Sequence, residues 1–204
     1  HRVHACMLLD IPVLYVESKG ATIQQTIIMN NNQKSWRNKD YLKCFSHKNH
    51  WNSAEYKKIQ AFNDEYGLNF TVSINLLAGY HKKSSCYWGS GSARKSFRKG
   101  TFKIKSLQTA QKYAGQLKRL KSVVPNLVTN GKFCMAWVNM QDRISPDSQG
   151  SWSIITGVKQ IERNVDELTH CKNQDSWDDG IVRAYNKGLN RKNKITITKE
   201  VDGS

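Results

Sequence analysis

The residues best suited to acid–base chemistry include six histidines, and one of them, His81, stands directly before two lysines, Lys82 and Lys83. Nearby cations disfavour a further positive charge, so we expect this imidazole to stay neutral and able to accept a proton. RNA can be cleaved at its own 2′-hydroxyl without a metal if one group removes that proton and another protonates the leaving oxygen. Our candidates for such catalytic groups are His81, His170 and Glu17.

A dense run of cations follows His81. Eight lysines and arginines and no acid lie between Tyr80 and Lys105, and no acid occurs anywhere between Glu65 and Asp142. A long single-sign field concentrates an anionic partner, and aromatic rings among the cations give unpaired bases a face on which to stack. We predict that residues 79–105 form a basic loop that grips RNA or another polyanion. The predicted substrate-binding residues are Lys82, Lys83, Trp88, Arg94, Lys95, Arg98 and Lys99, and Tyr87, Phe97 and Phe102 are further rings in this stretch.

Other motifs argue against a metal or a nucleotide cofactor. His47 and His50 have spacing that a metal site can use, but no further ligands are apparent near them, and the cysteines contain no Cys-x-x-Cys pair. The glycine-rich turn at 88–94 lacks the Gly-Lys-Ser/Thr ending of a P-loop. We therefore expect no metal and no cofactor, with His47 and His50 as further acid–base candidates.

Composition places the chain among secreted basic proteins. It has 204 residues and a formal net charge of +16, which favours an anionic partner, and no apolar run is long enough to span a membrane. Five dispersed cysteines suit two disulfides and one odd thiol, which predicts secretion; five reduced thiols in a cytosolic protein are the alternative. The start at His1, without a signal peptide, fits a processed or trimmed chain.

A resemblance to a known family rests on the layout of the chain. The Lys- and Asn-rich composition, with Glu17 near the start and His170 late in the sequence, resembles the ribonuclease subunits of secreted fungal killer toxins. The resemblance implies metal-free cleavage of transfer RNA by a glutamate and a distal histidine. It also implies a delivery subunit or an immunity protein, held through an odd cysteine or the basic face.

The elements expected to position these residues are mixed. Alternating apolar residues predict strands, and apolar residues at helical spacing predict helices that begin near Asn52, Ser106, Val158 and Ser176. We expect Asn52 and Glu55 to form a reciprocal capping box and Gly67 to end the first of these helices. We therefore predict one α+β domain, residues 1–204, with three to four helices packed on a mainly antiparallel sheet. The predicted strands are 7–17, 21–29, 68–76, 101–105, 133–140, 151–158 and 194–201.

Three functions remain open from the sequence. The first is a secreted toxin or effector that cleaves transfer or ribosomal RNA without a metal. The second is a non-catalytic module that binds nucleic acid, an anionic glycan or an acidic protein through the same surface. The third is a structural subunit, such as a capsid or matrix protein, which would assemble into large particles.

Overall fold

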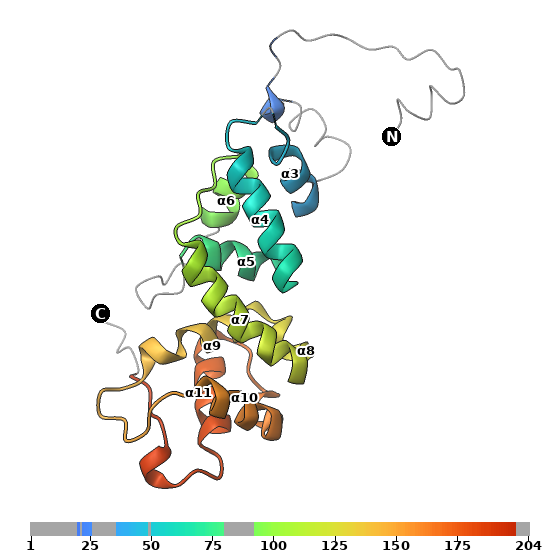
Figure 1. Ribbon diagram of the computed structural model, residues 1–204. Coiled ribbons are helices and arrows are strands. Elements are labelled where there is room, and N and C mark those ends of the chain that lie inside the picture. Colours follow the sequence, from blue (N-terminus) through green and yellow to red (C-terminus); the bar gives the residue numbers. More distant parts are fainter. Residues whose placement is uncertain (1–19, 21, 26–35, 49, 80–91, 199–204) are drawn as a thin grey trace, which may run out of the picture. The chain divides into compact units, whose positions relative to one another are not determined.

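The computed structural model describes residues 20, 22–25, 36–48, 50–79 and 92–198 (Figure 1). The chain divides into two units, residues 1–36 and 37–204, and all the labelled elements below belong to the second unit. Within the described residues this unit is built from helices and contains no strand, so the predicted α+β fold with an antiparallel sheet is wrong. The predicted strand at 7–17 lies outside the described residues.

The described helices of the second unit are joined by segments of different length. In the described part of this unit the elements are α3 (Asn38–Phe45), α4 (Ser53–Tyr66), α5 (Phe70–Leu77), α6 (Ser92–Arg98), α7 (Leu107–Val123), α8 (Pro125–Val128), α9 (Gly131–Arg143), α10 (Ile154–Arg163), the 3-10 helix η2 (Val165–Leu168), α11 (Gln174–Asn186) and the 3-10 helix η3 (Arg191–Asn193).

The alternating pattern at 68–76 belongs to helix α5. The Asn69 side chain accepts a hydrogen bond from the backbone N–H of Thr71 and so caps the helix. Every residue from Val72 to Leu77 is buried, including the polar Ser73 and Asn75. Because residues 72–77 are buried on all sides of the helix, the alternation of polar and apolar residues does not indicate a half-buried strand here.

The other strand predictions fail for related reasons. Residues 133–140 lie in α9, which is buried from Phe133 to Val138, and most of 151–158 lies in α10. Residues 101–105 have no partner strand among the described residues, and the described part of 194–201, up to residue 198, contributes a single bridge, between Ile197 and Ile144. Of the predicted strand at 21–29, residues 23–25 are helical.

Several predicted helix ends are confirmed. Asn52 precedes α4, Gly67 follows it in a left-handed conformation with φ 56°, and the Ser106 side chain caps α7 by accepting from the N–H of Thr109. The last long helix begins at Gln174 rather than at Ser176, because Asn173 is its N-cap and Ser176 completes the capping box.

Helix α7 links two groups of helices. It packs on α4 and α5, which also contact each other, and on α10, which packs on α11 (Figure 1). The second group has an aromatic core in which Trp152 lies edge-on to Trp137 and stacks on Tyr185. No helix in the described ranges is long and apolar enough to cross a membrane.

Candidate nucleic-acid interface

Helix α6 carries the central cations of the predicted basic loop and presents two chemically different faces. Ala93 and Phe97, one helical turn apart, are buried. The four cations that we call the α6 surface are exposed on the opposite side, and at 3.6 residues per turn they cover an arc of about 140°. The α6 surface consists of Arg94, Lys95, Arg98 and Lys99.

Phe97 anchors α6 to the helices beneath it. Its ring is fully buried and lies edge-on to Phe70 of α5, with ring centroids 4.9 Å apart. It also contacts Tyr56 of α4 at 5.2 Å and Tyr41 of α3 at 6.4 Å. Phe97 and Phe102, both predicted to lie among the cations as stacking rings, are therefore core residues and offer no face to a base.

A glycine cap ends α6 and fixes the position of its last turn. The N–H of Gly100 donates to the carbonyl of Phe97, and the N–H of Thr101 donates to that of Ser96, which is the Schellman pattern. Gly100 has φ 77°, and a Cβ at this position would lie 2.9 Å from Nε2 of His50 and 3.0 Å from Phe45. Only glycine fits both the backbone conformation and this contact.

His50 lies against Gly100 at this cap. Its ring is 9% exposed and packs against Phe45, with centroids 4.7 Å apart. Nδ1 of His50 accepts a hydrogen bond from the N–H of Asn52, and burial lowers the pKa of the imidazole. These contacts assign His50 a structural role, which its sequence neighbours do not reveal.

Two residues of α4 hold the segment that follows the cap. The Asn52 amide donates to the carbonyl of Phe102, and Glu55 Oε2 accepts from the N–H of Ile104 at 2.9 Å. The predicted reciprocal capping box of Asn52 and Glu55 is therefore wrong, because both side chains bind residues 102–104 instead. Burial raises the pKa of Glu55, but hydrogen bonds from Lys58 and Ile104 outweigh it and the net pKa is lowered.

Two further exposed cations follow the α6 surface in the sequence, and one cation of the surface contacts α3. Lys103 and Lys105 are exposed on either side of the partly buried Ile104. The guanidinium of Arg98 lies over the ring of Tyr41 in α3, 5.8 Å from its centroid, and α3 packs on α6. A cation over an aromatic face is held in place without losing its charge.

The predicted catalytic residues are not brought together in the described part. Glu17 and His81, like the predicted contacts Lys82, Lys83 and Trp88, lie outside the described residues. His170 is exposed just after η2, an element that packs on α11 rather than being part of the α3–α6 group. His50, which lies against the glycine cap of α6, has the contacts of a core residue.

Cysteines and possible metal ligands add no further site. Cys44, Cys134 and Cys171 are free thiols, and burial raises the pKa of each, for Cys134 to about 12. Two disulfides would need four of the five cysteines, so that prediction is wrong, while secretion stays a prediction. Within the described ranges, no three histidines, cysteines or acids gather where a metal ion would bind.

Comparisons of the chain with protein-family models, with curated proteins and with solved structures found no match. The resemblance to killer-toxin ribonucleases therefore stays a prediction.

Proposed function

We propose that this protein binds nucleic acid through the α6 surface, as a non-catalytic binding module, and that its preferred form is double-stranded DNA. The observation that carries the proposal is the division of α6 into a buried face, Ala93 and Phe97, and an exposed face made of four cations. Positive side chains that follow one face of a short helix are suited to contact phosphates on both sides of a groove.

The preference for a duplex follows from the burial of Phe97 and Phe102, the two described aromatic rings of the predicted basic loop. Single-strand binders stack bases on exposed rings, but Phe97 and Phe102 are 0% and 1% exposed. The major groove of B-form DNA is about 12 Å wide and admits an α-helix, whereas that of A-form RNA is too narrow for side chains to read. A helix that offers cations and no free ring fits the DNA groove best.

The packing around α6 supports such a role. Helices α4 and α5 are joined by a three-residue turn that begins at Gly67, and α5 packs on α6. Helix–turn–helix proteins likewise use supporting helices to hold an exposed helix in the groove. Here α5 is buried, so α6 is the helix that offers side chains to a partner.

The proposal is tested by fluorescence anisotropy with a labelled DNA duplex, its single strand and an RNA duplex of matched sequence. The double variant Arg94→Gln, Arg98→Gln should weaken duplex binding at least tenfold and flatten the log–log salt dependence by about 0.9 per lost phosphate contact. The matched control is Lys159→Gln, Arg163→Gln on α10, which removes two exposed cations at the same spacing. Equal losses in both variants would overturn the proposal.

The same preparation tests the ribonuclease hypothesis, which remains a prediction because Glu17 and His81 lie outside the described residues. Total transfer and ribosomal RNA is incubated with the protein in EDTA and read on a denaturing gel. Discrete fragments that disappear in His81→Ala or His170→Ala would establish metal-free cleavage. Intact RNA would leave binding as the function.

A further inference from the structure

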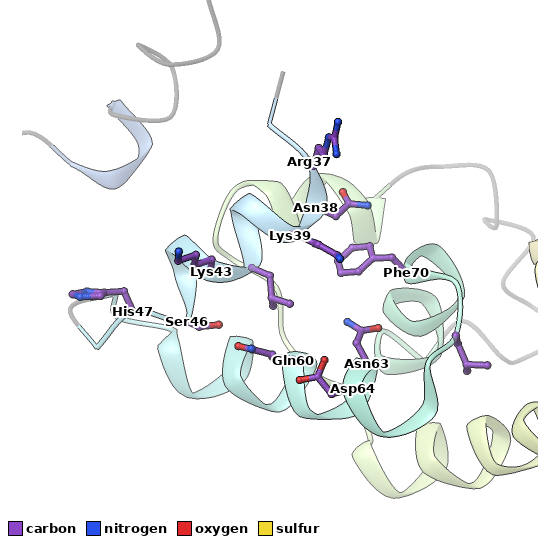
Figure 2. A pocket seen from close by; sticks show the side chains of 12 residues that line it. Arg37, Asn38, Lys39, Lys43, Ser46, His47, Gln60, Asn63, Asp64 and Phe70 are labelled. Atoms are coloured by element: carbon purple, nitrogen blue, oxygen red, sulfur yellow. The ribbon is translucent and has the colours of Figure 1, made fainter. Parts of the chain in front are cut away.

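A second site lies between α3 and α4, where the two helices and the start of α5 line an open pocket of about 930 Å³ (Figure 2). Side chains of both helices line it, and Phe70 of α5 forms part of its wall. A pocket of this volume holds a small organic molecule. None of the residues assigned to the α6 surface lines it.

Four buried polar atoms on the wall of this pocket lack hydrogen-bond partners among the described residues. Oδ1 and Nδ2 of Asn63, Oδ1 of Asn38 and Oγ of Ser46 are buried and make no hydrogen bond with the described residues. They are four of the nine such atoms in the described part, so the deficit is concentrated here. Buried polar atoms are nearly always hydrogen-bonded in folded proteins. These atoms have almost no exposed surface, so a ligand that supplies both donors and acceptors would satisfy them after a small movement of the side chains.

Asn63 is the most informative of these residues. Its side chain projects from α4 into the pocket, next to Asp64 (Figure 2). An amide that has both its oxygen and its nitrogen unpaired offers one acceptor beside donors in a single plane. The edge of a nucleobase presents the complementary arrangement of donor and acceptor.

The charge around the pocket favours an anion. Arg37, Lys39 and Lys43 line it together with a single acid, Asp64. A wall with three cations and one carboxylate attracts a negatively charged group such as a phosphate. The carboxylate in turn is an acceptor for hydroxyl groups, such as those of a ribose.

Apolar side chains complete the wall and suit a flat ring. Leu42, Leu68 and Phe70 line the pocket, and an aromatic face such as that of Phe70 stacks readily on a base. We propose that this pocket binds a mononucleotide, with its base against Phe70 and the Asn63 amide, and its phosphate at Arg37, Lys39 and Lys43. This inference is independent of the proposed duplex binding, because it rests on different residues.

The test uses the full chain and four probes, AMP, GMP, CMP and UMP, titrated by isothermal calorimetry. Inorganic phosphate and adenosine are titrated separately as the two halves of the ligand. We expect saturable binding of at least one nucleotide, at least tenfold tighter than either half. No binding of any of the four, or equal binding of phosphate alone, would overturn the proposal.

Two variants assign the binding to this pocket. Asn63→Leu removes an unpaired buried amide, so it should weaken nucleotide binding at least tenfold while urea unfolding shows no loss of stability without ligand. Lys43→Gln should also weaken binding at least tenfold, and it tests the site even if the first variant does not fold. Lys57→Gln, an exposed lysine of α4 outside the pocket, is the matched control. Undiminished binding by Lys43→Gln contradicts the assignment.

One further variant separates this site from the proposed duplex interface. The Arg94→Gln, Arg98→Gln protein should bind the nucleotide as tightly as the wild type. A tenfold loss in that variant would place the nucleotide on the α6 surface and overturn the pocket assignment. Nucleotide binding without duplex binding, or the reverse, would show which of the two proposals fails.

Discussion

The hydroxyl of Tyr56 donates a 2.6 Å hydrogen bond to the backbone carbonyl of Phe97, and this bond ties the first half of α4 to the last turn of α6. Tyr56 is fully buried, and its burial raises the pKa of the hydroxyl, so the group stays a donor at every physiological pH. This hydrogen bond helps to fix the position of α6 and therefore of its cations.

Replacing Tyr56 tests how much this hydrogen bond contributes to stability. Tyr56→Phe removes the donor and keeps the ring, and the Phe97 carbonyl still accepts from the N–H of Gly100. We therefore expect the free energy of unfolding to fall by about 1 kcal/mol, the net contribution of one hydrogen bond. Urea unfolding followed by circular dichroism measures the loss. Unchanged stability would show that the bond is not formed in solution.

Alanine substitutions at Gly100 and Gly188 distinguish the cost of backbone strain from the cost of steric contact. Gly100 and Gly188 have nearly the same φ, 77° and 76°, but a Cβ at Gly188 would meet no atom within 4 Å. Gly188→Ala should cost about 1 kcal/mol from the left-handed backbone alone. Gly100→Ala should cost clearly more, because its Cβ would also meet His50 and Phe45. Differential scanning calorimetry compares the two variants, and equal costs would contradict the steric argument.

The buried imidazole of His50 predicts a pH dependence of stability. Burial lowers its pKa below the value of about 6.5 found in unfolded chains. As the pH falls below that value, the unfolded chain takes up the proton first, so stability should be full above about pH 7 and decline below about pH 6.5. His50→Gln should remove part of this decline in urea unfolding at a series of pH values. His170→Gln, at an exposed position, should keep it.

The ion pair between Arg143 of α9 and Asp178 of α11 predicts a larger change in the free energy of unfolding than the variants above. Nη1 of Arg143 contacts Oδ2 of Asp178, whose side chain is 1% exposed. Asp178→Ala would leave the guanidinium partly buried and unpaired, which costs about 3 to 5 kcal/mol. The double variant Arg143→Met, Asp178→Leu removes both charges and should recover most of the loss. A double variant as unstable as the single one would argue against the pair as the cause.

The sequence predicts the helix ends much better than the fold class. Asn52, Gly67 and Ser106 lie where predicted because caps depend on the backbone within one turn. Helix α5 was missed because it is buried on all sides, and only tertiary packing distinguishes such a segment from a buried strand.

The candidate interface was predictable in part. Charge alone singled out Arg94, Lys95, Arg98 and Lys99, and the structure exposes all four, while their role in binding remains a prediction. Phe97 was misread because an aromatic residue among cations is equally able to be the buried anchor of a helix. The signal for α6 was present in Arg98-Lys99-Gly100, since cations followed by glycine are typical of a helix end.

Two lysines of α7 show that cations in the acid-free part of the chain also make hydrogen bonds within the protein. Nζ of Lys118 donates to the carbonyl of Glu65, and Nζ of Lys121 donates to that of Gly67 at 2.7 Å, at the end of α4. A cation at the carboxyl end of a helix stabilises its dipole. Acetylation of either lysine would remove a charge and a donor there. An acetyltransferase that reached α7 would therefore loosen its attachment to α4 without touching any cation of α6.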